Sequence, residues 1–194
     1  MAGSVAWNEV EDALIRLGEF LEKPTALTVI GSAVCMSLGQ PGRMTIDVDV
    51  WRRTSRFDLG DLKRACQKAG IDFNPQTYGE PDRLYLQLVE PGIVQLGEFE
   101  ATAEIATAGK LTLTRPPIEN LVASKLVRGE ARDYDDIVFM VSKCGITQAQ
   151  IEAAIATIPD KMARETAQEN LVMLEIALNA GTPRPSPSTL PRLG

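Results

Sequence analysis

The sequence predicts an α+β fold, in which a small mixed sheet with flanking helices is followed by a C-terminal helical bundle. Short runs rich in β-branched residues, separated by glycine and proline turns, occupy most of the chain up to about residue 115. Beyond that point, apolar residues recur at helical spacing and the helical segments end at glycines. These observations divide the chain into an α/β core over 1–115, a helical subdomain over 116–181 and a disordered tail over 182–194.

The elements of the core follow from local sequence patterns. Trp7, Val10 and Leu14 begin an apolar series at helical spacing, and Pro24 ends it. Gly70 is the stop signal of a later helix. The predicted elements are, in order, a helix over 5–22, a strand over 26–30, a helix over 32–38, a strand over 45–51, a helix over 61–69 and strands over 84–89, 93–96 and 111–113.

The helices of the second part are predicted from start and stop signals. Proline is tolerated in the first turn of a helix, so Pro116 and Pro117 favour a helix start there. Thr147 and Gln150 form a capping-box pattern. The predicted helices run from 116 to 129, from 133 to 145, from 147 onward and from 160 to about 181. The tail is rich in proline and serine, which predicts disorder.

Asp47 and Asp49 are the most informative residues of the predicted sheet. They are two positions apart in an apolar strand, so their side chains point to the same face. Two unpaired carboxylates side by side repel each other, and one of them is then expected to hold its proton. A divalent cation between them removes this cost, and Mg²⁺ readily adds phosphate oxygens as further ligands. The alternative is an edge strand that exposes both aspartates to solvent.

Gly31 and Ser32 directly follow the preceding predicted strand. Glycine lets the backbone approach a ligand closely. Ser32 stands at the start of the next predicted helix, where free N–H groups bind anions. The alternative role of Ser32 is that of a helix N-cap. A phosphate at Ser32 and a metal ion at Asp47 and Asp49 together describe a nucleoside triphosphate with its metal.

These segments resemble the nucleotidyltransferase superfamily of the DNA polymerase β type, and within it the AbiEii-like branch of bacterial toxin-related proteins. The family pattern has Gly-Gly/Ser, then Leu-Gly, then Arg-x-Ser/Thr-x-Asp-φ-Asp, where φ is apolar. A second family block on helices has the form Lys-Leu…Arg-Asp-x-x-Asp. The matching residues lie within about residues 25–145 and are Gly31-Ser32, Leu38-Gly39, Arg43, Thr45, Asp47, Asp49, Lys125-Leu126, Arg132-Asp133 and Asp136.

The resemblance implies a sheet of the nucleotidyltransferase type and roles for individual residues. It implies that Asp47 and Asp49 bind Mg²⁺ (or Mn²⁺) and are catalytic together with Lys125, which faces the phosphates. It also implies nucleotide-binding or bracing roles for a further set, which comprises Gly31, Ser32, Arg43, Lys125, Asp133 and Asp136.

The residues of the second block also allow structural roles. Lys125 fits a surface lysine whose stem lies along apolar neighbours. Asp133 fits an acid at the positive end of a helix. Asp136 lies one turn beyond Arg132, so these two side chains are placed to pair on one helix face.

The function implied by the resemblance is transfer of a nucleotide from an NTP to an acceptor hydroxyl of an RNA (tRNA included) or a protein. The family setting is a toxin–antitoxin or phage-defence system, with a cognate antitoxin as a partner. The alternative is a catalytically decayed relative that acts as a nucleotide- or protein-binding module, and a third option is an aminoglycoside-modifying transferase. The sequence departs from the usual pattern at the third carboxylate, because Gln95 stands in the 93–96 segment and only Glu98 and Glu100 follow it.

Composition limits the remaining possibilities. The formal net charge of −6 argues against broad non-specific binding to nucleic acid. The chain has no histidine, so acid–base roles fall to other side chains or to metal-bound water. The three dispersed cysteines predict free buried thiols in a reducing cytoplasm. No signal peptide or membrane-spanning run is recognised, so we expect a cytoplasmic protein that does not contact a membrane.

Overall fold

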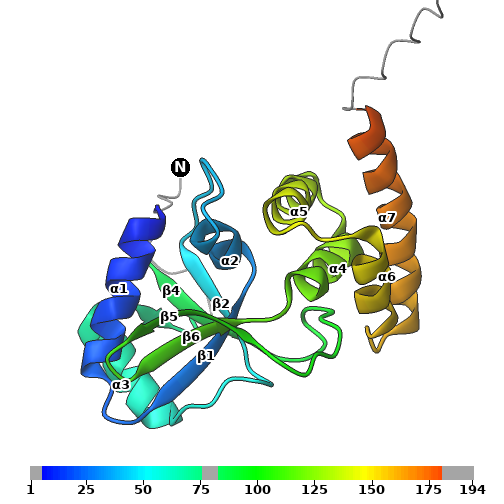
Figure 1. Ribbon diagram of the computed structural model, residues 1–194. Helices are drawn as coiled ribbons and strands as arrows, with labels where there is room; N and C mark the ends of the chain where they lie inside the picture. Colours follow the sequence, from blue (N-terminus) through cyan, green and yellow to red (C-terminus); the bar gives the residue numbers. More distant parts are fainter. Residues whose placement is uncertain (1–5, 76–82, 181–194) are drawn as a thin grey trace, which may run out of the picture.

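The computed structural model describes residues 6–75 and 83–180, with the side chains of 176–180 excepted. Figure 1 shows a sheet with its helices on one side of the molecule and a group of helices on the other. The predicted α+β class with a small mixed sheet is confirmed, since six strands pair in the order β3-β4-β2-β1-β6-β5. The predicted disordered tail over 182–194 lies outside the described residues.

The helices and strands alternate in the first part of the chain, and helices follow one another in the second. Their bounds are α1 Trp7–Phe20, β1 Thr25–Ile30, α2 Ser32–Ser37, β2 Asp47–Trp51, α3 Leu59–Ala69, β3 Asp72–Phe73, β4 Tyr85–Val89, β5 Ala103–Ala108, β6 Leu111–Arg115, α4 Ile118–Arg128, α5 Ala131–Cys144, α6 Gln148–Ala156 and α7 Lys161–Ala180.

Strand β2 lies in the interior of the sheet. It pairs antiparallel with β1, where Ile30 is opposite Asp49, and parallel with β4, where Asp49 is opposite Gln87. Val48 and Val50 of the same strand are fully buried. Strand β2 thus has a neighbouring strand on each side, and the alternative of an exposed edge strand for the two aspartates is wrong.

The segment after β4 differs from the prediction. Residues 93–96 make no strand, and the bridge between Pro91 and Val94 is isolated. The reason lies in the sheet order, because β2 and β3 occupy both edges of β4 and leave no place for a hairpin partner. The short strand β3 and the strand β5 were not predicted, and β5 pairs antiparallel with β6.

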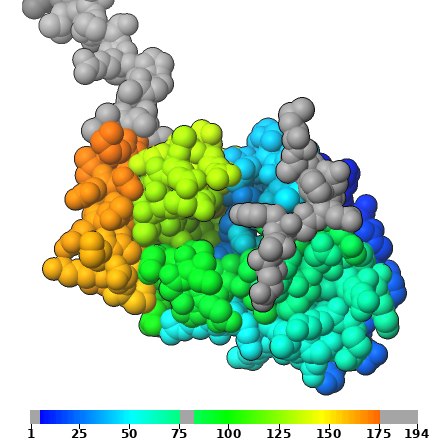
Figure 2. Space-filling view, turned by 180° about the vertical axis from the view of Figure 1, so that it is seen from behind, coloured from blue at the N-terminus to red at the C-terminus, as the bar shows by residue number. Residues whose placement is uncertain are grey.

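Helix α4 is the centre of the helical half. It packs against α5, α6 and α7, which Figures 1 and 2 show gathered around it. Its apolar face is buried, and Leu126 is fully buried together with Ile137, Met140, Ile155 and Leu174 from the other three helices. Helix α5 begins at Ala131, earlier than predicted.

The early start of α5 has a local cause. The side chains of Glu130 and Asp133 each bond the other residue's backbone N–H in a capping box.

Cys35 and Cys66 are buried as expected, whereas Cys144 is exposed at the end of α5, so the expectation of a third buried thiol is wrong. Among the described residues, no helix combines the length and the apolar character needed to cross a membrane.

Candidate functional site

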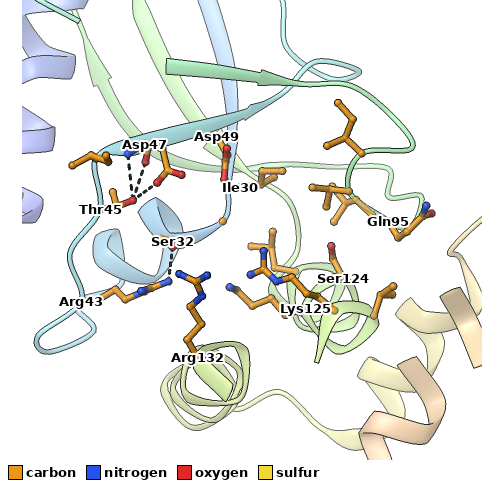
Figure 3. Close-up of a pocket in the computed structure, with 18 of the residues that line it drawn as sticks. Ile30, Ser32, Arg43, Thr45, Asp47, Asp49, Gln95, Ser124, Lys125 and Arg132 are labelled. Atoms are coloured by element: carbon orange, nitrogen blue, oxygen red, sulfur yellow. Dashed lines mark hydrogen bonds between the residues drawn. The ribbon is translucent and has the colours of Figure 1, made fainter. Parts of the chain in front are cut away.

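A cavity of about 690 Å³ lies between the sheet and the first two helices of the second half. Its lining comes from the β1–α2 turn, the loop before β2, β2 itself, the 93–96 segment, α4 and the start of α5. Figure 3 shows the carboxylates of β2 on one wall and several cationic side chains on the facing wall. The cavity therefore brings together segments that are about a hundred residues apart in the sequence.

The acidic wall consists of Asp47 and Asp49. Both are half-buried, and both line the cavity. Burial in low-dielectric surroundings, and then the neighbouring charge of Asp47, raise the pKa of Asp49 to about 7. The positive charges of Arg128 and Lys125 act in the opposite direction. The hydroxyl of Thr45 donates a hydrogen bond to Oδ1 of Asp47 and fixes the orientation of that carboxylate.

Position 31 requires glycine, because the carboxylate of Asp49 lies too close for any side chain there. Its φ of +71° is disfavoured for residues with a side chain, and a Cβ built on it would lie 2.6 Å from Oδ2 of Asp49. Gly31 is also the N-cap residue of α2, so the alternative of Ser32 as the N-cap is wrong. Instead, the hydroxyl of Ser32 accepts a hydrogen bond of 2.5 Å from the guanidinium of Arg43.

The facing wall is cationic. Arg43, Lys125, Arg128 and Arg132 all line the cavity. Lys125 is buried, with a relative exposure of 8%, so the alternative of a surface lysine is wrong. Arg128 and Arg132 are largely exposed at the rim, where their charges remain accessible to a ligand entering from solvent.

Two buried carboxylates lie behind this wall and hold its cations. Asp136 accepts hydrogen bonds from Lys125 at 2.7 Å and from Arg43 at 3.1 Å through the same oxygen. Asp133 accepts two from Arg128, at 2.6 and 2.5 Å, and lies 3.3 Å from Nζ of Lys125. Burial alone would raise the pKa of Asp133, but the hydrogen bonds and charges of Arg128 and Lys125 together outweigh burial and lower the pKa.

The placements of Asp133 and Asp136 define their roles. Neither lines the cavity, and their exposures are 0% and 1%. The expected pair between Arg132 and Asp136 is wrong, because Arg132 bonds Glu130 at 3.3 Å while Asp136 bonds Arg43 and Lys125. The structure therefore places these two acids as supports of the cationic wall.

Several lining residues were not singled out from the sequence. Arg128 lies three residues after Lys125 on α4, and this spacing is a helical signal that would have predicted a shared face. Ser124 and the apolar residues of the 93–96 segment carry no such signal. Glu98 pairs with Arg53 at 2.9 Å on the surface and is not among the cavity residues.

The chemistry of the acidic wall suits a divalent cation that is shared with a ligand. Burial, and then the negative charge of Asp47, raise the pKa of Asp49, and a cation between the two carboxylates would offset both effects. No group of three or more acidic, cysteine or histidine side chains suited to a metal occurs in the described part of the chain. The residues thus fit Mg²⁺ that takes its remaining ligands from phosphate oxygens and water.

Comparisons of the chain with protein-family models, with curated proteins and with solved structures each find no match.

Proposed function

We propose that the protein binds a nucleoside triphosphate with Mg²⁺ and transfers its nucleotidyl group to an acceptor hydroxyl. The observation that carries this proposal is the pairing of two opposite walls in one cavity. Asp47 and Asp49 form the acidic wall, and Lys125 and Arg43 face them from the other side in Figure 3. Arg128 of the same cationic wall also lines the cavity. A polyphosphate is negatively charged, so the cationic wall attracts it. The two carboxylates repel a polyphosphate unless a shared divalent cation lies between them and the phosphate oxygens.

The size and electrostatics of the cavity support the same ligand class. A volume of about 690 Å³ lies within the range of small-molecule sites, roughly 300–1,000 Å³. The cations on the facing wall are held in place before the ligand arrives, because Asp133 and Asp136 fix Arg128, Lys125 and Arg43. Groups that are fixed in advance lose little entropy on binding and stabilise developing charge without rearrangement.

In the proposed reaction, an acceptor oxygen forms a bond to the α-phosphorus, and the bond from that phosphorus to the α–β bridging oxygen breaks. Pyrophosphate leaves with the electron pair of the broken bond, and the proton of the acceptor hydroxyl passes to solvent. Mg²⁺ held by Asp47 and Asp49 would neutralise part of the phosphate charge. Lys125 and Arg128 stabilise the charge that accumulates on pyrophosphate, and Asp47 and Asp49 would hold the metal.

A second candidate is a module that binds the nucleotide without transferring it. The observation in its favour is that Asp47 and Asp49 are the two acids among the described cavity residues, while Gln95 occupies the segment where a third was expected. A transferase of the two-metal type generally needs that third carboxylate. An aminoglycoside acceptor is less well supported, because it calls for further acids that the described lining does not offer.

The acceptor class follows from resemblance and from the rim of the cavity. We propose an RNA, tRNA included, or a protein hydroxyl, in a toxin–antitoxin or phage-defence setting. Arg128 and Arg132 lie exposed at the rim, where they suit a phosphate of an RNA acceptor. The net charge of −6 limits such contacts to this small basic area.

Calorimetry with a non-hydrolysable NTP tests the binding step. We expect binding that requires Mg²⁺ and that is lost in the Asp47→Ala/Asp49→Ala double variant. Equal nucleotide binding by the double variant and the original chain would refute the metal site. Incubation with each α-labelled NTP, Mg²⁺ and total RNA or lysate then separates the two candidates, since a transferase labels an acceptor and a binding module labels none.

A further inference from the structure

The cavity has an apolar end that metal and phosphate chemistry does not use. Ser124 and Gln95 line the cavity on the side away from Thr45 and Arg43, as Figure 3 shows. Aliphatic residues of the cavity accompany them in sequence: Val94 precedes Gln95, and Leu121 and Val127 lie one turn before and after Ser124 on α4. An inorganic polyphosphate gains nothing from contact with such side chains, because their benefit comes from removing apolar surface from water.

Ile93 extends this apolar end to the solvent. It lines the cavity and is 73% exposed, although it is a large aliphatic residue. Covering it with the apolar face of a ligand would be favourable, in proportion to the apolar area removed from water. The face of a nucleobase is a flat apolar surface of the kind that such a side chain would contact.

The polar groups at this end are free to bind a ligand. Neither Ser124 nor Gln95 forms a side-chain hydrogen bond within residues 6–75 and 83–180, and the hydroxyl of Ser124 points into the cavity in Figure 3. A hydroxyl donates one hydrogen bond and accepts others, and a glutamine amide offers a carbonyl acceptor beside an N–H donor. A mostly apolar wall with a few polar groups is typical of sites that orient an organic ligand.

We propose that this end of the cavity is a nucleoside subsite, in which Ile93 and Val94 contact the base, Gln95 reads its edge and Ser124 bonds the sugar. The inference rests on the proposed function and names the substrate more closely. Glutamine pairs bidentately with adenine through N6 and N7, whereas guanine offers two acceptors at N7 and O6. The subsite therefore favours ATP over GTP.

The test compares three Mg²⁺-bound ligands, which are inorganic tripolyphosphate and non-hydrolysable analogues of ATP and GTP. Each is titrated against the original chain, Gln95→Leu and Ser124→Ala. Gln67→Leu is the matched control, because Gln67 is exposed on α3 and does not line the cavity. Melting curves confirm that every variant is folded.

We expect the original chain to bind the ATP analogue more tightly than either other ligand. Gln95→Leu should weaken ATP binding about tenfold and reduce the preference over GTP, as expected for hydrogen bonds lost to a base edge. Ser124→Ala should weaken both nucleotides by roughly threefold to tenfold. Tripolyphosphate should bind all variants alike, and Gln67→Leu should behave as the original chain.

The outcomes separate the two proposals. If neither nucleotide nor tripolyphosphate binds, the proposed function fails and the subsite fails with it. If all three ligands bind but tripolyphosphate binds as tightly as ATP, or both variants bind nucleotides like the original chain, the nucleoside subsite is overturned while the phosphate and metal site stands. Equal binding of ATP and GTP by the original chain overturns the reading of the base by Gln95.

Discussion

The Nζ atom of Lys125 lies 2.7 Å from Oδ2 of Asp136, and both side chains are buried. The same carboxylate oxygen accepts a hydrogen bond from Arg43, which precedes β2 in the sheet half of the molecule. Asp136 thus joins a cation from each half of the chain at a single atom. The position of the cationic wall relative to the acidic wall depends on this junction, and it offers a direct test of the site's construction.

Asp136→Asn should lower both stability and nucleotide affinity. The change removes the charge that balances Lys125 and Arg43 inside the protein, and loss of one partner of a buried ion pair costs about 3–5 kcal/mol. The asparagine still accepts a hydrogen bond, so we expect the free energy of unfolding, measured with urea, to fall by about 2–4 kcal/mol. Asp135→Asn is the control, because Asp135 is the exposed neighbour on α5. Equal stability of the two variants would contradict the role of Asp136.

Lys125→Ala and Lys125→Arg test the phosphate-facing lysine. Lys125→Ala should weaken binding of Mg²⁺–NTP and also lower stability, because Asp133 and Asp136 then lose a buried positive partner. Lys125→Arg keeps the charge but not the compact ammonium group, so it should retain part of the nucleotide affinity and part of the stability. Calorimetry and urea unfolding measure the two effects, and Lys143→Ala, at an exposed site of α5, is the control. Unchanged nucleotide binding in Lys125→Ala would show that Lys125 serves only the fold.

The sequence was sufficient for the acidic wall because its information is local. The period of two within one strand places Asp47 and Asp49 on a common face. Gly31 was predicted to let the backbone approach a ligand, and the structure shows that it also makes room for the carboxylate of Asp49. The cationic wall was predicted in part. Lys125 was assigned by resemblance, but its partners were not, because they depend on how α4 and α5 pack.

Long-range packing explains the other differences. The helical spacing from Arg132 to Asp136 favours a pair, yet Asp136 bonds Arg43, which lies 93 residues away in sequence. Half of the residues of strand β5 are alanine, which has a low strand propensity, so its pairing with β6 stabilises the strand more than its own propensity does. Residues 93–96 show the reverse case. Their sequence predicts a strand, but both edges of β4 are already paired, so no strand edge is free for them.

The raised pKa of Asp49 predicts a pH-dependent stability of the metal-free protein. Its pKa is about 7 in the folded protein and 3.8 ordinarily, so between these values the folded protein holds a proton that the unfolded chain has lost. The contribution of this group is therefore fully present below about pH 4 and is lost as the pH rises to about 7. Asp49→Asn removes the effect, so its stability relative to the original chain should increase from about pH 4 to about pH 7 and stay level above that.

The measurement is urea unfolding in the presence of a chelator at several pH values. Asp47→Asn is an informative second variant, because the charge of Asp47 contributes to the raised pKa of Asp49. It should reduce the pH dependence without abolishing it, since burial remains the larger cause. If the difference between Asp49→Asn and the original chain is the same at every pH, Asp49 does not titrate in this range.

Gly31→Ala tests the contact between the β1–α2 turn and β2. The new Cβ would lie 2.6 Å from Oδ2 of Asp49, and φ at this position is +71°. Gly39 provides a matched control, because its φ is +86° and a Cβ there would meet no atom within 4 Å. Gly39→Ala should therefore lower the free energy of unfolding only through backbone strain, by about 1–2 kcal/mol as measured with urea. Gly31→Ala should lose more, because the carboxylate must also move.

The two glycine variants should differ still more in ligand binding. Movement of the Asp49 carboxylate disturbs its place beside Asp47, so Gly31→Ala should weaken Mg²⁺–NTP binding by at least tenfold, by analogy with small displacements in other sites. Gly39→Ala should bind the nucleotide like the original chain, since it lies outside the cavity lining. Normal nucleotide binding by a folded Gly31→Ala would mean that the acidic wall tolerates displacement of Asp49, and that Asp47 carries the metal without it.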